Sequence, residues 1–445
     1  MKKNYYKKTL PIKRVKLSNF KGVSQEWYSK TTPIDFAVAQ ENLKTLNGAL
    51  VASMSPQKLD IVFEDKIKKV IPYYENDLKL IVVCANKCFL LQTENGTQTK
   101  TELAFDFEIF DSTLYKYGEE SYLILATDKG LKKFSQGAVE DSEISVQFAK
   151  ICNHFYRIFA VSRDSAKLEF SDDFAPFNWN QSIDEGGYIN LSFDNGNITD
   201  LISFNQHLIA CQTDGFTKIT AYSEQEDFVT KSINSPNNIK NGSVVNCGDF
   251  IMYATNKGLG VFDGYNCKSI CEGLSGFLKN CDVQAVATSE YCYFLCKNNG
   301  GDIFDNFIIA YDLAYSDYHF ITCKDASSLV KVKYDGKEYV LVVEGNFLSL
   351  LSVDSNGENK IWKSGLIDFA SPAEYKLLKN IVFGGSTIID LKITVDDKNY
   401  FFNISHKRSC LLNLKGKQFV FEIVPKGRNI NVPSPVLEYS VLEEN

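Results

Sequence analysis

Short runs of apolar and aromatic residues, separated by turns that contain glycine, recur along most of the chain. Two of these runs match closely: residues 122–134 are YLILATDKGLKKF and residues 250–262 are FIMYATNKGLGVF. Each has an apolar strand, a turn in which Asp or Asn precedes Lys-Gly, and a second strand, a pattern typical of a β-hairpin. The two starts lie 128 residues apart. That is three periods of about 43 residues, and 43 residues is a usual length for one β-propeller blade.

Other hairpins fall on the same period. Their turns are predicted near residues 87, 130, 164, 215, 258, 300 and 345. A single four-stranded blade cannot bury both of its faces, whereas a ring of blades stacks them against one another. An aromatic content of 13%, almost all Phe and Tyr, also favours strands. The pattern therefore predicts an all-β chain in which residues 51–360 form a β-propeller of seven blades.

The period ends near residue 360. About six shorter strand-like runs follow within residues 361–445, and they predict a small C-terminal β-sandwich. Gly384-Gly385 is expected to form a turn between two of them. Residues 1–50 contain no clean hairpin, so we expect an N-terminal arm there, with strands that close the ring or brace the sandwich.

Charge separates the N-terminus from the rest of the chain. Residues 1–21 contain eight basic residues and no acidic ones, and because the net charge is −7 the remaining 424 residues sum to −15. So acidic a body repels phosphate groups, and general nucleic-acid binding is not expected. The arm is either a solvated terminus or a segment that docks on an acidic neighbouring subunit or on DNA. The candidate assembly residues are Lys2, Lys3, Lys7, Lys8, Lys13, Arg14 and Lys16.

No residue pattern indicates catalysis, a metal or a cofactor. The four histidines include no pair at i, i+4, and the chain has no nucleophile elbow, Walker loop or dinucleotide fingerprint. His154 and His207 stand where strands are predicted to start, and we interpret both as structural. The 12 cysteines are scattered without nearby histidines and are expected to be reduced. Neither a secretion signal nor a membrane span is apparent. The expectation is a protein that is not an enzyme, has no cofactor or metal, and has no membrane partner.

One segment keeps a carbohydrate function open. Residues 171–179, SDDFAPFNW, resemble the aspartate turns of sialidases, which are β-propellers. A sialidase repeats this turn in several blades and holds the substrate carboxylate with three arginines, whereas this chain has one such turn and five arginines in all. A propeller that binds or cleaves glycans is therefore the alternative hypothesis. A scaffold of the WD-repeat type is less favoured, because repeated Gly-His and Trp-Asp dipeptides do not occur.

The same segment belongs to a longer pattern. After Ser171-Asp172 come Pro176-Phe-Asn-Trp179, Gly187-Tyr-Ile189 and then Ile198-Thr-Asp-Leu201. Further pieces are Asn19-Phe-Lys-Gly-Val23 and Asn47-Gly-Ala-Leu50 near the start, and Ser364-Gly-Leu-Ile-Asp368 near the end. Together they resemble β-propeller virion proteins of phage tails, such as hub, nozzle and stabilisation proteins. The residues that carry the resemblance, with structural roles, are Ser171, Asp172, Pro176, Trp179, Gly187, Gly365 and Asp368.

The resemblance implies a structural component of a bacteriophage virion that acts by subunit packing and has no catalytic residues. It would be assembled in the host cytoplasm and located in the tail or at the head–tail junction. Its partners would be other virion proteins, namely connector, tail-tube or tail-tip subunits. The chain itself would form a homo-oligomeric ring, most simply a hexamer, in which DNA in the lumen makes only transient contact.

Overall fold

The structure, a computed structural model, describes residues 10–17, 20, 22–23, 34–75, 77–94, 97–182, 185–221, 225–298, 306–353, 360–427 and 429–442. The chain divides into two units. The first consists of residues 1–55, 309–322 and 352–445, and the second of residues 56–308 and 323–351.

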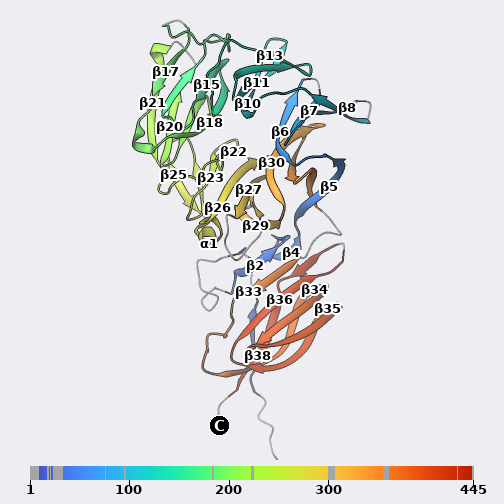
Figure 1. Ribbon diagram of the computed structural model, residues 1–445. Helices are drawn as coiled ribbons and strands as arrows, with labels where there is room; N and C mark the ends of the chain where they lie inside the picture. Colours follow the sequence, from blue (N-terminus) through green and yellow to red (C-terminus); the bar gives the residue numbers. More distant parts are fainter. Residues whose placement is uncertain are drawn as a thin grey trace, which may run out of the picture. The chain divides into compact units, whose positions relative to one another are not determined.

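The second unit is a β-propeller (Figure 1). Its described strands form six four-stranded antiparallel sheets, and the hairpin of β26 and β27 supplies the sixth of the seven blades. The first five blades are β6–β9, β10–β13, β14–β17, β18–β21 and β22–β25, and the seventh consists of β30, β31, β32 and β5. The bounds are β5 (Met54–Val62), β6 (Ile67–Tyr74), β7 (Leu78–Cys84), β8 (Cys88–Glu94), β9 (Thr97–Leu103), β10 (Ile109–Tyr117), β11 (Glu120–Thr127), β12 (Gly130–Ser135), β13 (Ala138–Asp141), β14 (Lys150–His154), β15 (Arg157–Val161), β16 (Lys167–Phe170), β17 (Gly187–Asn190), β18 (Ile198–Phe204), β19 (His207–Gln212), β20 (Gly215–Thr220), β21 (Val229–Asn234), β22 (Val245–Asn246), β23 (Ile251–Ala254), β24 (Leu259–Phe262), β25 (Cys267–Ile270), β26 (Cys281–Ala287), β27 (Tyr291–Asn298), β30 (Ala326–Tyr334), β31 (Lys337–Glu344) and β32 (Phe347–Val353). Short helical turns are η1 (Phe193–Asn195), η2 (Gln225–Asp227), η3 (Glu272–Leu274) and α1 (Ser275–Leu278).

The first strands of the blades form a closed ring. Contacts run from β10 through β14, β18, β22, β26 and β30 to β6. The circle is completed where Lys69 Nζ on β6 donates to the Phe110 carbonyl on β10 at 2.5 Å. In the seventh blade, β5 from the start of the propeller pairs with β32 from its end. This arrangement ties the two ends of the ring together, and it confirms a propeller of seven blades.

Apolar side chains from facing sheets fill the spaces between blades. Between the second and third blades, for example, Ile124 and Leu131 lie against Phe148 and Ile158, and all four are buried. A buried side chain of this kind stabilises the fold by about 1.5–3 kcal/mol. The repeated apolar strands therefore correspond to interfaces that no single blade could bury alone.

The predicted turns occupy one equivalent place in successive blades. Those near residues 87, 130, 164, 215, 258 and 345 join the second strand of a blade to the third. The turn predicted near residue 300 lies outside the described residues. The sequence period therefore corresponds to the turn between the second and third strands of each blade. For this reason the number of predicted turns gave the number of blades.

The two matching segments fold with the same local hydrogen bonds. In the second blade, Thr127 Oγ1 donates to the Gly130 carbonyl at 2.7 Å and accepts from the Lys129 N–H at 3.1 Å. In the fifth blade, Thr255 Oγ1 bonds Gly258 and Lys257 in the same way, at 3.1 Å for both. The shared Ala-Thr-Asp/Asn-Lys-Gly sequence is thus a turn closed by its threonine.

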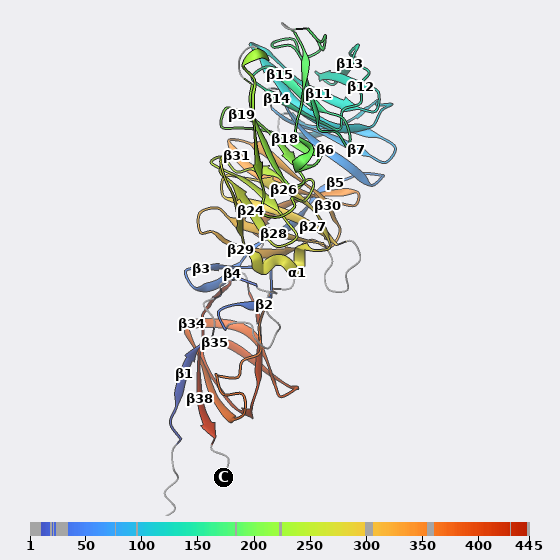
Figure 2. The ribbon, with the colours of Figure 1, turned by 90° about the vertical axis from the view of Figure 1, so that its left-hand side faces the viewer.

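The first unit contains the predicted sandwich. The strands assigned to this unit are β1 (Lys13–Lys16), β2 (Ala37–Glu41), β3 (Leu43–Leu46), β4 (Ala49–Ala52), β28 (Phe307–Asp312), β29 (Asp317–Thr322), β33 (Ile361–Ser364), β34 (Tyr375–Val395), β35 (Lys398–Gly416), β36 (Phe419–Pro425), β37 (Asn431–Pro433) and β38 (Val436–Leu442), of which β28 is next to β27 in the strand order. β34 and β35 form one long hairpin (Figure 2). The first half of β34 pairs with β38 and its second half with β36, so the two halves of this strand have different neighbours.

The turn predicted at Gly384-Gly385 is wrong. β34 continues through these residues as a strand, and only its register against β35 shifts, between Val382 and Thr387. The shift lies where β34 changes partner from β38 to β36, so the glycines mark an irregularity of the strand at that change. Within the first 50 residues, β1 extends the sheet next to β38, and β2 pairs with β33.

Candidate functional site

The motif segment joins the third and fourth strands of the third blade. Ser171 Oγ accepts from the Ile158 N–H at 2.9 Å and donates to the Asp172 carbonyl at 2.9 Å. The Asp172 N–H donates to the Asn178 carbonyl at 2.9 Å, and Asn178 Nδ2 returns a hydrogen bond to Asp172 Oδ2 at 3.2 Å. Ser171 and Asp172 therefore close a turn, as aspartate and serine do elsewhere in proteins.

Two aromatic residues of this segment pack against the second blade. Trp179 stacks on Phe148 with ring centroids 4.9 Å apart, while its Nε1 donates to the Pro176 carbonyl at 2.9 Å. Phe177 stacks on Tyr122 of β11 at 6.4 Å. Because these rings join the apolar cluster between the second and third blades, the segment closes that interface.

Arg157, at the start of β15, forms hydrogen bonds with the same segment. The residue is 5% exposed, and its Nη1 donates to the carbonyls of Ser171 at 3.1 Å and Glu185 at 3.2 Å. Its Nη2 lies 3.7 Å from Asp173 Oδ1. The guanidinium thus ties both ends of the segment to the blade. Arg157 was not among the predicted site residues, although a basic residue opening an apolar strand was a signal for it.

Gly187, where the segment returns to the sheet, has no room for a side chain. A Cβ there would lie 2.8 Å from the Phe170 ring and 2.9 Å from Gln225 Oε1. Gln225 comes from the fourth blade, and its Nε2 donates to the Glu185 carbonyl at 2.5 Å. The segment is therefore anchored to both neighbouring blades. Of the predicted motif residues, the structure brings together Ser171, Asp172, Pro176, Trp179 and Gly187.

The other predicted residues lie in the first unit. Gly365 and Asp368 follow β33, where Ser364 Oγ donates to the Gly365 carbonyl at 2.7 Å and the Ala370 N–H donates to Asp368 Oδ1 at 2.9 Å. Of the basic arm, Lys13, Arg14 and Lys16 lie on β1, and Arg14 Nε bonds Glu438 Oε1 at 2.9 Å. Lys2, Lys3, Lys7 and Lys8 lie outside the described residues.

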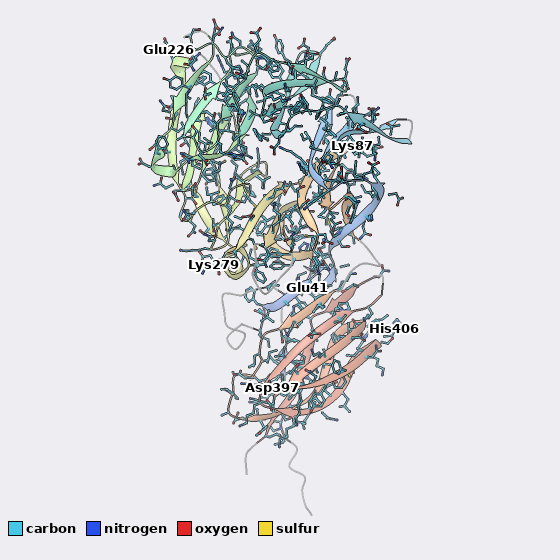
Figure 3. All side chains as sticks on the ribbon, in the orientation of Figure 1. Glu41, Lys87, Glu226, Lys279, Asp397 and His406 are labelled. Carbon is cyan, nitrogen blue, oxygen red and sulfur yellow. The ribbon has the colours of Figure 1, made fainter. Side chains whose placement is uncertain are left out.

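The first unit also presents a long strand edge, here called the β35 edge. β35 runs for 19 residues, pairs with β34, and has no second partner among the described strands. Its sequence contains four Lys and Arg residues and no Asp or Glu. Phe401 and Leu411 are exposed on it, at 74% and 70%, and His406 is labelled in Figure 3. An unpaired edge of this length offers N–H and C=O groups to another chain.

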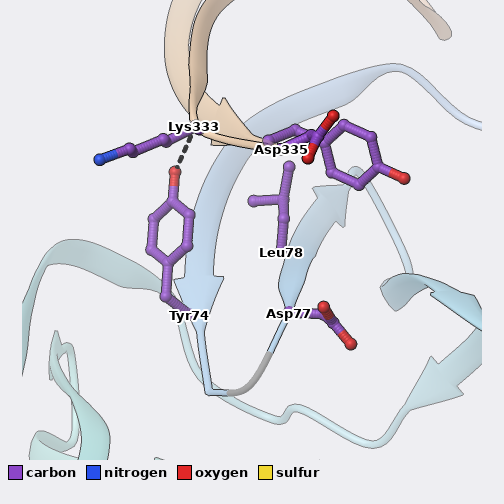
Figure 4. A pocket seen from close by; sticks show the side chains of 7 residues that line it. Tyr74, Asp77, Leu78, Lys333 and Asp335 are labelled. Carbon is purple, nitrogen blue, oxygen red and sulfur yellow. Dashed lines mark hydrogen bonds between the residues drawn. The ribbon is translucent and has the colours of Figure 1, made fainter.

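A small cavity lies at the seam between the first and seventh blades (Figure 4). Its volume is about 430 Å³, and its rim is fixed by the Lys333 N–H, which donates to the Tyr74 hydroxyl at 2.7 Å. A ligand there would meet two phenols and two carboxylates. The lining residues are Tyr74, Asp77, Leu78, Lys333, Tyr334, Asp335 and Gly336.

The titratable groups of the described ranges offer no metal centre. No group of three His, Cys, Asp or Glu side chains in that part of the chain could hold an ion. All twelve cysteines are free thiols. His154 is buried at the end of β14 rather than at the start of a strand, with Nδ1 2.8 Å from Ser203 Oγ, and burial lowers its pKa to about 4.

None of the helices in the described ranges is long and apolar enough to cross a bilayer.

Solved structures similar to this chain include β-propellers at low identity. The extracellular domain of BT4673 from B. thetaiotaomicron is 11% identical, with a TM-score of 0.47, over 89% of this chain and 62% of that one. The chain thus spans less than two thirds of that domain. The WD40 domain of Neurospora crassa Pan2 is 9% identical, with a TM-score of 0.42, over 66% of this chain and 91% of that one. Kluyveromyces lactis Hsv2 is 10% identical, with a TM-score of 0.35, over 61% and 93%. No family model and no curated protein sequence matches the chain.

Proposed function

We propose that this chain is a structural component of a bacteriophage virion, a tail hub, nozzle or head–tail stabilising protein that acts by subunit packing and has no catalytic activity. The support is the motif pattern in the sequence together with the use of its third-blade residues. The hydrogen bonds of the polar groups of Ser171, Asp172 and Trp179 stabilise the turn and the interface between blades. A segment used in this way stiffens the propeller as a building block.

The observation that carries the proposal is the β35 edge. A strand of 19 residues extends for about 60 Å, and strands in globular proteins average about 5–6 residues. Proteins normally cover or shorten such edges, because they pair readily with other chains. A neighbouring subunit that adds a strand would satisfy these backbone groups and form a continuous sheet. Repeated around a closed ring, this contact would join copies of the chain or join the chain to another tail protein.

The charge of the β35 edge selects its neighbour. No acidic residue of β35 balances its four basic residues, Lys398, Lys407, Arg408 and Lys415. An acidic surface would complement them, and the body of the chain beyond residue 21 carries a net −15. Partners under this proposal are copies of the chain and the connector or tail subunits next to it, within the virion tail.

Reversing charge on the β35 edge is expected to weaken assembly without unfolding the chain. In the variant Lys407→Glu with Arg408→Glu, both changes lie at exposed positions. We expect the dissociation constant of the oligomer to rise at least tenfold, about 1.4 kcal/mol. Sedimentation velocity of the full chain over a concentration series measures this change, and the melting temperature checks the fold.

The matched control reverses two exposed lysines of the propeller, Lys257→Glu and Lys279→Glu. This variant should assemble like the unmodified chain. The proposal fails if the control weakens assembly as much as the β35 variant does. It also fails if the unmodified chain stays monomeric at every concentration and does not associate with co-expressed tail proteins.

A further inference from the structure

Three aromatic side chains from separate segments meet on the propeller surface, and they are here called the aromatic patch. Tyr117 ends β10, Tyr156 lies in the turn between β14 and β15, and Phe174 belongs to the motif segment. Phe174 lies 4.9 Å from Tyr156 in a stacked arrangement and 5.0 Å from Tyr117. Their exposed fractions are 49%, 41% and 49%. Most large aromatic residues of the propeller are buried between blades, so this group is an exception.

The backbone beneath the patch is strained. Phe155, Tyr156 and Phe174 have φ values of +46°, +65° and +54°, a region that bulky residues rarely adopt. The turn at 155–156 has two successive positive φ values, for which Asn-Gly or Asp-Gly is preferred. The equivalent turn of the seventh blade uses Asp335 and Gly336, with φ +48° and +72°. Strain of this kind tends to persist where the side chains serve a function.

A buried phenol lies among the patch residues. Tyr115 is 2% exposed, and its hydroxyl has no hydrogen-bond partner within the described protein. Burial raises its pKa, and the nearby Tyr117, Glu120, Tyr156 and Asp173 raise it further. The hydroxyl therefore keeps its proton at neutral pH and lies within electrostatic reach of two patch residues. The enclosed phenol thus forms the apolar floor beneath the patch and offers no hydrogen bond to a ligand on the surface.

The rim of the patch is acidic. Glu119, Glu120 and Asp173 are exposed near it, against one exposed cation, Lys116. The Arg157 guanidinium donates to the carbonyls of Ser171 and Glu185, and its Nη2 lies 3.7 Å from Asp173 Oδ1, so the acidic excess comes from Glu119 and Glu120. This charge balance disfavours an anionic ligand. Carboxylates can instead accept hydrogen bonds from hydroxyl groups.

We propose that the aromatic patch binds a neutral oligosaccharide. A pyranose ring offers C–H groups that pack on the faces of Tyr156, Phe174 and Tyr117. Its hydroxyl groups can donate to the half-exposed carboxylate of Asp173. This binding is separate from the β35 edge and does not rest on the proposed assembly role.

The test is titration calorimetry of the full chain with chitohexaose, cellohexaose and maltohexaose, and with a hyaluronan hexasaccharide as an anionic probe. We expect at least one neutral probe to bind and hyaluronan not to bind. Phe174→Ala and the double variant Phe155→Asn with Tyr156→Gly should each weaken that binding at least tenfold. The double variant suits the backbone of the turn, so its melting temperature should be equal to or above that of the unmodified chain. Tyr265→Ala, which removes an aromatic 65% exposed elsewhere on the propeller, is the matched control and should bind normally.

Several results would overturn this inference. They are no binding of any neutral probe at millimolar concentration, equal binding by the patch variants, and preference for hyaluronan. A marked loss of melting temperature in the double variant would show that the patch is structural. If the patch variants lost self-association, the patch would be a protein interface. Failure of the β35 charge-reversal test would leave the sugar result unaffected, so the two proposals can fail separately.

Discussion

Replacing Gly130 with alanine is expected to lower the free energy of unfolding of the propeller by about 4 kcal/mol. Gly130 has φ +93°, and an added Cβ would lie 1.9 Å from the Ile144 carbonyl oxygen. That carbonyl cannot simply move away, because it accepts the Leu131 N–H at 2.9 Å. The backbone of the second blade would have to separate at this point. Thermal unfolding followed by circular dichroism measures the loss.

Gly118→Ala is the matched control. Gly118 also has a positive φ, +60°, but nothing lies within 4 Å of a Cβ built on it. Only the conformational cost should remain, about 1–2 kcal/mol. Equal destabilisation by the two variants would contradict the close approach that the structure gives Gly130.

Removing the guanidinium of Arg157 is the second change with a large expected effect. Arg157→Met keeps much of the buried volume but leaves the carbonyls of Ser171 and Glu185 without that donor. We expect a loss of about 3 kcal/mol. Arg157→Lys should recover only part of it, because an ammonium lacks the planar fork that reaches both carbonyls. Melting temperature reports the stability, and limited proteolysis reports whether residues 171–186 have come loose.

Arg163→Ala tests whether the effect belongs to this position. Arg163 is exposed in the turn between β15 and β16, so its loss should change stability by less than about 0.5 kcal/mol. An Arg157→Met variant as stable as the unmodified chain would mean that the motif segment holds itself in place.

The propeller could be predicted because its physical requirement repeats. The turn at Gly130 recurs at Gly258, where a Cβ would lie 2.7 Å from the Cys271 carbonyl oxygen. Any residue other than glycine would collide with backbone at both places, so both turns require glycine, and in both a threonine closes the turn. Local chemistry of that kind is visible in a single sequence.

The long strands of the sandwich could not be predicted as continuous. Gly384-Gly385 in β34 and His406 in β35, with φ +55°, interrupt the strand pattern as turns would. The structure passes through both because β34 takes hydrogen bonds from β38 on one side of the glycines and β36 on the other. Such long-range pairing leaves no local trace in the sequence.

The aromatic patch was missed for a related reason. Tyr117 and Phe174 are 57 positions apart in the numbering, and the fold alone brings them to a centroid distance of 5.0 Å. A strand was predicted to start at His154, whereas β14 ends there and Phe155-Tyr156 form a turn. Aromatic residues normally favour strands. The sequence pattern therefore gave no indication of a turn in which Phe155 and Tyr156 are exposed.

The most direct test of the proposed role is cryo-electron microscopy of phage particles purified from a lysate of the source host. We expect the chain to form a ring in the tail or at the head–tail junction, with β35 paired to a strand of a neighbouring subunit. Particles that lack the chain, or a ring in which β35 stays solvent-exposed along its whole edge, would contradict it.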